Sequence, residues 1–192
     1  MIKKLLCTSL SLLFLFALAI PAYASPKTLS FHDLTIDQQA TYNEYLTKGY
    51  DVSISQNEEG LVVISGSKKL SKAITILAEI EDVTFIVDQS VYLGNYKVAT
   101  VEGSLTAKIT NYSSATITSY PLTLKAYGVY LGCTFTTPTY NNTTGSGYAK
   151  LVQSFNGTVQ SPSGGALSGA TFPVNMNYTV TASTGTLTIS QS

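Results

Sequence analysis

The feature that most constrains the fold is an unbroken alternation of apolar and polar residues over positions 99–110. Successive side chains of a β-strand point to opposite faces, so this pattern predicts a strand with one face in a core and one in water. A similar alternation runs over 172–182, and shorter ones follow Val83 and Tyr120. Because turn residues separate these segments, the sequence predicts a mainly β protein, either an antiparallel β-sandwich or a partly open barrel.

One short α-helix is expected before these strands. Thr35 and Gln38 have the spacing of a capping box, with Thr35 as the N-cap. Tyr42 and Tyr45 then fall on one face of the helix, and Lys48-Gly49 forms a reasonable stop. We expect this helix to pack against the sheet that follows it.

Several local features are predicted along the rest of the chain. Residues 68–81 fit both a strand and a helix, and their β-branched content favours a strand. The apolar phase changes at Gly128, which predicts a bulge or bend. Residues 137–147 are predicted to form a loop because they are rich in Pro, Asn, Thr and Gly. Asn156-Gly157 is the strongest two-residue hairpin signal in the chain.

The N-terminus has the pattern of a signal peptide. Lys3 and Lys4 precede an apolar run over about 10–20, and Pro21-Ala22-Tyr23-Ala24 forms a small-residue cleavage site. We therefore predict a signal peptide at 1–24 and a secreted or surface-associated domain at 25–192. The apolar run is too short to span a bilayer, so no transmembrane segment is expected after cleavage. The style of this segment suggests a bacterial protein.

The distribution of charge sets limits on partners and organisation. Only 11% of the residues are charged, against roughly 25% in an ordinary domain, and the chain contains no arginine. This argues against binding to nucleic acid. Every Asp and Glu lies at or before Glu102. A sub-boundary near 89–97, between an acidic α+β entry segment and a nearly neutral β body, is therefore possible.

The sequence contains no recognisable catalytic constellation. After cleavage at Ala24 it retains one histidine, His32, and one cysteine, Cys133. His32 stands next to Asp33, and sequence neighbours do not form the base–orienter geometry of a triad. Cys133 has the same phase as Phe135 and is predicted to be a buried, inert thiol, with an intermolecular disulfide as the alternative. We expect no enzyme activity and no cofactor.

No metal site is predicted either. The acidic residues that cluster in sequence lack the spacing of a calcium loop, and a solvated turn is the simpler interpretation. These residues are Glu79, Glu81, Asp82 and Asp88.

Tyrosine is the most suggestive remaining feature, because the chain has 13 of them and no tryptophan. An exposed tyrosine combines an apolar ring with a polar tip, which suits contact with a glycan or a protein. The alternative is that tyrosine is simply a good strand residue. The residues predicted to form a binding surface are Tyr92, Tyr96, Tyr127, Tyr130 and Tyr140.

The sequence therefore predicts a secreted, non-enzymatic protein that binds an extracellular partner such as a wall polymer, a glycan or another protein. Three alternatives stay open. Low charge and threonine-rich strands also suit a self-associating matrix or fibre component. Alternating strands suit a β-type pore-forming protein, and the eleven acidic residues leave room for a hydrolase.

Overall fold

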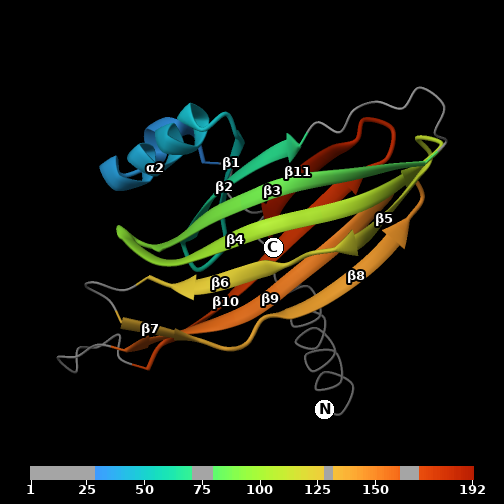
Figure 1. Ribbon diagram of the computed structural model, residues 1–192. Coiled ribbons are helices and arrows are strands. Elements are labelled where there is room, and N and C mark those ends of the chain that lie inside the picture. The colour runs from blue at the N-terminus through green and yellow to red at the C-terminus, as the bar shows by residue number, and fades with distance from the viewer. Residues whose placement is uncertain (1–28, 71–79, 128–131, 161–168) are drawn as a thin grey trace, which may run out of the picture.

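The computed structural model describes residues 29–70, 80–127, 132–160 and 169–192, which form two facing antiparallel sheets and one α-helix (Figure 1). This confirms the predicted mainly β, sandwich-like architecture. Sheet A contains β1 (Asp51–Gln56), β2 (Leu61–Leu70), β3 (Ile80–Leu93), β4 (Tyr96–Thr110), β5 (Ser114–Ser119) and β6 (Leu122–Ala126). Sheet B contains β7 (Gly132–Phe135), β8 (Thr139–Gly145), β9 (Tyr148–Gln160), β10 (Thr171–Thr181) and β11 (Thr186–Gln191).

In each sheet, one edge is formed by two short strands that pair with the same long strand. Sheet A runs β1-β2-β3-β4, and the far edge of β4 pairs with β5 along one part and β6 along another. Sheet B runs β11-β10-β9, with β7 and β8 both on the far edge of β9. The region near 89–97 lies within the β3–β4 hairpin, so the two strands that flank it belong to one sheet.

The main core lies between the sheets and follows the alternation read from the sequence. On β4, Val101, Leu105 and Ala107 are fully buried in this core. Val174 and Val180 of β10 are buried in the same core from the opposite sheet. The predicted strands at 99–110 and 172–182 are therefore confirmed, together with their buried faces.

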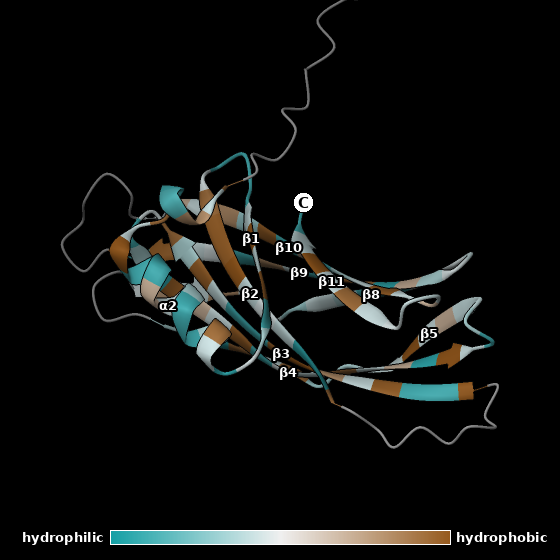
Figure 2. Cartoon of the chain, turned by 90° about the horizontal axis from the view of Figure 1, so that it is seen from above, coloured by the Kyte–Doolittle hydropathy of each residue, from teal (hydrophilic) through white to brown (hydrophobic). Residues whose placement is uncertain are grey.

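Helix α2 (Ile36–Thr47) covers the outer face of sheet A, after a short 3-10 turn η1 (Phe31–Asp33) (Figure 2). The predicted capping box is present: Thr35 Oγ1 accepts from Gln38 N, and Gln38 Oε1 accepts from Thr35 N. Tyr45 is buried against Ile64 and Tyr92 in a second apolar cluster outside the main core. A locally encoded helix start thus places α2 over β1, β2 and β3.

Two local predictions are wrong. Asn156-Gly157 is not a hairpin turn, because β9 continues through it in register with β10. A Cβ at Gly157 would lie 2.2 Å from Cζ of Phe172, so this glycine makes room for a ring of the core. The predicted loop at 137–147 contains strand β8, which pairs with β9 from Thr139 onward. Its polar residues are tolerated because it is an exposed edge strand.

Two other predictions fall largely outside the described residues. In the ambiguous stretch 68–81, the structure describes the end of β2 and the start of β3, but not 71–79. The phase change at Gly128 lies in 128–131, which is also outside.

Candidate functional site

The candidate site is an open groove along the side of the sandwich where β6 of sheet A faces β7 and the start of β8 in sheet B. It has a volume of about 550 Å³. Three threonines line it together with six residues that are apolar or aromatic, namely Leu122, Leu124, Ala126, Phe135, Pro138 and Tyr140. Among the described residues no charged side chain lines it. We refer to it as the β6–β7 groove.

The groove exists because the edge of sheet A is broken at Tyr120-Pro121. Pro121 lacks a backbone N–H and interrupts the edge between β5 and β6. Its carbonyl oxygen passes so close to Gly103 that a Cβ there would lie 2.1 Å away, and Gly103 has a φ of +156°. This close crossing turns β6 onto a new course along β4.

Two hydrogen bonds join the sheets here, one beside the groove and one between two residues that line it. Asn142 Nδ2 of β8 donates to the Ile117 carbonyl of β5 at 2.8 Å. Tyr140 Oη donates to the Leu122 carbonyl of β6 at 3.2 Å, at one end of the groove wall. Tyr140 also packs against Tyr120, with ring centroids 5.1 Å apart. These contacts fix the position of Tyr140 in the groove.

Tyr140 is also the outer end of a polar network that crosses the main core. Gln153 Nε2 donates to Tyr140 Oη at 3.2 Å, and Tyr178 Oη lies 2.7 Å from Oε1 of Gln153. Tyr178 Oη lies at the same distance from Gln89, whose other amide atom is 3.1 Å from Ser65 Oγ. Burial is the main cause that raises the pKa of both Tyr140 and Tyr178, so both are neutral phenols.

The proton count gives this network a direction. Tyr178 has one hydroxyl proton and cannot donate to the Oε1 atoms of two glutamines at once. Turning the Gln89 amide over resolves this: Nε2 of Gln89 then donates to Tyr178 Oη, and its Oε1 accepts from Ser65 Oγ. Each group then donates to the next, from Ser65 to the Leu122 carbonyl. The network therefore links β2, β3, β10, β9 and β8 to the groove.

The sequence contains a signal for this network that the tyrosine argument missed. Gln89 lies in the buried phase of Val87 and Val91, and Gln153 lies in that of Leu151 and Phe155. A polar residue on the apolar face of a strand needs a buried partner.

The five tyrosines predicted to form a binding surface do not lie on one patch. Tyr140 lines the groove, whereas Tyr92 is 1% exposed and bonds Thr41 beneath α2 at 2.6 Å. Tyr96 and Tyr127 are exposed near the β3–β4 turn and the end of β6. Tyr130 lies outside the described residues.

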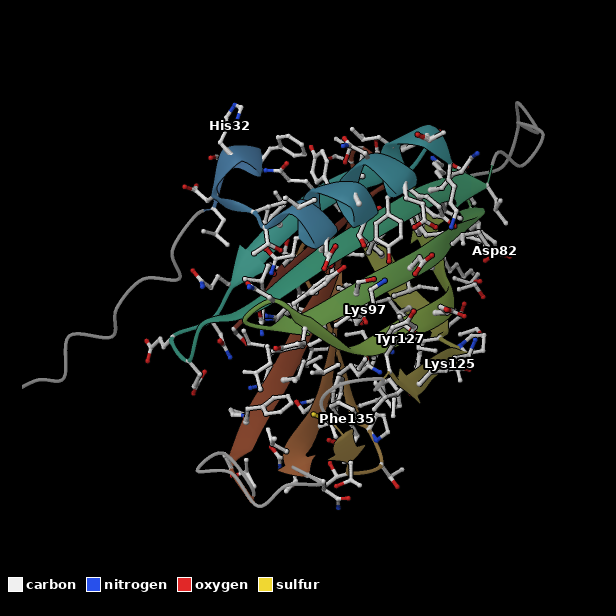
Figure 3. The ribbon with its side chains drawn as sticks, turned by 90° about the vertical axis from the view of Figure 1, so that its left-hand side faces the viewer. His32, Asp82, Lys97, Lys125, Tyr127 and Phe135 are labelled. Atoms are coloured by element: carbon white, nitrogen blue, oxygen red, sulfur yellow. The ribbon has the colours of Figure 1, made fainter. Side chains whose placement is uncertain are left out.

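The ammonium group of one lysine lies near the rings of both Tyr92 and Tyr127. Lys97 Nζ lies 5.2 Å from the ring centroid of Tyr127 and 5.8 Å from that of Tyr92, within cation–π range. Figure 3 shows Lys97, Tyr127 and Lys125 on the same side of the molecule. Lys125 in turn pairs with Glu102 at 2.6 Å. This surface mixes rings with both signs of charge and differs chemically from the neutral groove.

Asp88 and Glu102 are two acidic residues that lie opposite each other in the β3–β4 register. Burial, followed by the smaller effect of Glu102, raises the pKa of Asp88, although the hydroxyl of Tyr45 donates to it at 2.9 Å. Tyr45 belongs to α2, so this bond anchors the helix to the sheet. Attachment of α2 to the sheet therefore explains the position of Asp88.

The remaining predicted residues are placed as follows. His32 is exposed in η1 and projects from the end of the molecule far from Phe135 of the groove (Figure 3). Cys133 is a free, half-buried thiol packed against the main core, and burial raises its pKa. Glu81 and Asp82 lie at the start of β3, and Glu79 lies outside the described residues. Within the described ranges no group of three or more His, Cys, Asp or Glu side chains is placed to hold a metal ion.

Comparison with known proteins gives no relative: no family model, no curated protein and no solved structure matches this chain. In the part of the chain that the structure describes, no helix is both long and apolar enough to cross a membrane. The function is therefore inferred from the geometry of the site.

Proposed function

We propose that this protein acts outside the cell as a binding protein, and that it captures an extended polypeptide segment of a partner in the β6–β7 groove. The observation that carries the proposal is that the groove lies between edge strands of both sheets, β6 in sheet A and β7 in sheet B. An unpaired edge presents N–H and C=O groups that can bind another strand.

The chemistry of these edges supports strand addition. Natural edge strands are commonly protected by charged residues, which discourage pairing with another chain. Strand β7 carries no charged residue, and the single lysine of β6, Lys125, pairs with Glu102 away from the groove lining. Among the described residues, both edges are therefore open to main-chain hydrogen bonding, except at the Leu122 carbonyl, which accepts from Tyr140 Oη.

The side chains of the groove favour a particular kind of segment. Leu122, Leu124 and Phe135 are half-buried and pack against the main core, so a bound strand would extend that core outward. A neutral lining gives no ion pair to a charged ligand, which would lose hydration on entering. We therefore expect segments that alternate apolar and polar residues and carry no net charge.

The experiment is a selection of short linear peptides displayed on phage against the immobilised protein. The enriched peptides are then synthesised, and their affinities are measured by fluorescence polarisation. We expect uncharged, alternating sequences to be enriched. The variant Thr137→Lys, which places a charge and a longer side chain on the exposed groove wall, is expected to weaken their binding about tenfold or more.

The matched control is Thr188→Lys, the same change at an exposed position of β11 outside the groove. It is expected to leave the affinity unchanged. Peptide binding that survives Thr137→Lys, or binding of neutral oligosaccharides with no peptide selected, would contradict the proposal. If the bound strand comes from a second copy of this chain, sedimentation velocity will detect association that Thr137→Lys abolishes, and the matrix-component alternative then replaces partner binding.

A further inference from the structure

The outer face of sheet B is a surface apart from the β6–β7 groove. Helix α2 lies on the outer face of sheet A, and no described helix or strand covers the outer face of sheet B (Figure 2). Threonine and asparagine fill most outward positions of β8, β10 and β11, and Lys150 of β9 is the single charged residue among the strands of this sheet. The face is therefore polar and nearly uncharged.

Tyr148 gives this face an aromatic platform. In the β8–β9 register it lies opposite Gly145. A Cβ at Gly145 would overlap the Tyr148 ring, so the ring lies over the β8 backbone in the place that a side chain would take. The residue is nevertheless 43% exposed. Because one face of the ring rests on the strand, the other face is available for a ligand to stack on.

Asn177 supplies an independent sign of a ligand on the same face. It points outward from β10, between the inward-facing Met176 and Tyr178, and yet only 7% of it is exposed. Within the described residues its side-chain amide has no hydrogen-bond partner, and this amide is not sealed from solvent as that of Gln191 is. A buried amide without partners is costly, and a molecule lying on this face supplies the missing bonds.

The chemistry of the face indicates an uncharged ligand that is rich in hydroxyl groups. Sugar hydroxyls both donate and accept, so they match the two polar atoms of the Asn177 amide. The C–H groups on one side of a sugar ring match the electron-rich face of the Tyr148 ring. The sheet carries no carboxylate to attract a cation and one lysine to attract an anion.

The spacing of the two residues indicates the length of the ligand. Tyr148 lies opposite Thr181 of β10, and Asn177 lies two outward positions further along that strand. At the ordinary rise of a β-strand these positions are about 14 Å apart. This span is longer than one sugar ring, so a single ligand that reaches both residues must be an oligosaccharide.

We propose that the outer face of sheet B binds an uncharged, linear, β-linked glucan chain, which runs along β9 and β10 from Tyr148 to Asn177. A β-linked chain is an extended ribbon whose sugar rings present broad faces, whereas an α-linked chain curves away from a sheet. One ring stacks on Tyr148, and hydroxyls of another ring bond the Asn177 amide. The site goes beyond the proposed function, because it lies on a different face and takes a different class of ligand.

The test is isothermal titration of the full mature chain with cellohexaose, maltohexaose and glucose in separate runs. The β-linked cellohexaose is expected to bind about tenfold more tightly than the α-linked maltohexaose or glucose. Tyr148→Ala is expected to weaken cellohexaose binding about tenfold or more, and Tyr148→Phe, which keeps the ring, should restore it. Tyr96→Ala removes a similarly exposed tyrosine from sheet A and is the matched control.

Asn177→Val separates a ligand site from a packing role. No hydrogen bond within the described residues is lost, and valine is a good strand residue of similar size. The ligand-free protein is therefore expected to melt at the same or a higher temperature, while the affinity for cellohexaose falls about tenfold.

Two variants distinguish this site from the β6–β7 groove. Thr188, which lies opposite Thr179 on the outer face, is not part of the groove, so Thr188→Lys should weaken cellohexaose binding and leave peptide binding unchanged. Thr137→Lys should do the reverse. Cellohexaose binding that is unchanged by Tyr148→Ala or by Asn177→Val would overturn the proposal. So would equal affinity for maltohexaose, or the absence of any sugar binding.

Discussion

Two buried tyrosines hold the two apolar clusters together in different ways. Tyr178, between the sheets, is fully buried and bonds the neutral amides of Gln89 and Gln153. Tyr45, on α2, lies under the helix and bonds Ser90 and the carboxyl of Asp88. Asp88 is only half-buried, because it lies at the margin of the cluster.

The difference follows from the cost of burying charge. An ionised carboxylate in the dry core would lose its hydration, whereas an amide can be satisfied there by hydrogen bonds alone. At the margin beside α2 a carboxylate keeps part of its hydration and still accepts a hydrogen bond. The network that leads to the groove should therefore be insensitive to pH, and the attachment of the helix should not be.

The largest effect is expected for Tyr178→Phe. Removing the hydroxyl leaves one polar atom of each glutamine buried without a partner, at a cost of about 4 kcal/mol in the free energy of unfolding. Urea denaturation at several pH values measures this cost and should give the same loss throughout. A loss that varied strongly with pH, or one below that of Tyr45→Phe, would remove the contrast between the two clusters.

The next prediction compares how tightly the two clusters are packed. At Gly157 an added Cβ would overlap the ring of Phe172, which is 4% exposed and has little room to move. At Gly66 an added Cβ would lie 3.1 Å from Cδ2 of Tyr45, so a shift of a few tenths of an ångström relieves the contact. We expect Gly157→Ala to cost about 3 kcal/mol and Gly66→Ala about 1 kcal/mol, measured by urea denaturation. Equal costs would mean that the main core relaxes as readily as the helix contact.

Gly157 also illustrates what the sequence could and could not predict. The helix start at Thr35 was predictable because its capping box is made by residues three positions apart. The strand faces were predictable because alternation directly reports burial. Asn156-Gly157 was wrongly predicted to be a hairpin turn, because the glycine is needed to make room for the ring of Phe172, which belongs to another strand.

The candidate site was less predictable for the same reason. Of its residues, Tyr140 was identified from the sequence, but β8 was not, because an exposed edge strand needs few apolar residues. The groove depends on how Pro121 crosses Gly103, and the network depends on Gln89 and Gln153 meeting one tyrosine. These are contacts between distant segments, and local patterns do not report them.

Tyr45→Phe is expected to have an intermediate effect. It removes the hydroxyl that bonds Asp88 and Ser90 while leaving the ring in place, so the free energy of unfolding should fall by about 2 kcal/mol at neutral pH. The loss should be accompanied by faster hydrogen exchange in α2, since this bond ties the helix to β3. Tyr42→Phe, a half-buried neighbour on the same helix, is the control and should change neither quantity appreciably.

The smallest effect concerns the ionisation of Asp88. Its pKa in the folded protein is raised, chiefly by burial, above the ordinary value of 3.8. At pH values between 3.8 and this raised pKa, the folded state holds more protons than the unfolded state. The stability that Asp88 contributes therefore increases as the pH falls through that range, and it is lost as the pH rises through the folded-state pKa. Asp88→Asn keeps an acceptor for Tyr45 without the charge. It should stabilise the protein at pH 7 by less than about 1 kcal/mol, because the side chain is half-exposed and screened.

The advantage of Asp88→Asn should therefore shrink as the pH falls through the raised folded-state pKa of Asp88, because the native carboxyl then takes up its proton. Asp82→Asn, at an exposed position on the same strand, is the control and should show no comparable trend. If the advantage of Asp88→Asn instead grew on acidification, the ionised form of Asp88 would be the one that holds α2. The bond from Tyr45 would then outweigh burial, and the outer cluster, unlike the Tyr178 network, would be built around a charge.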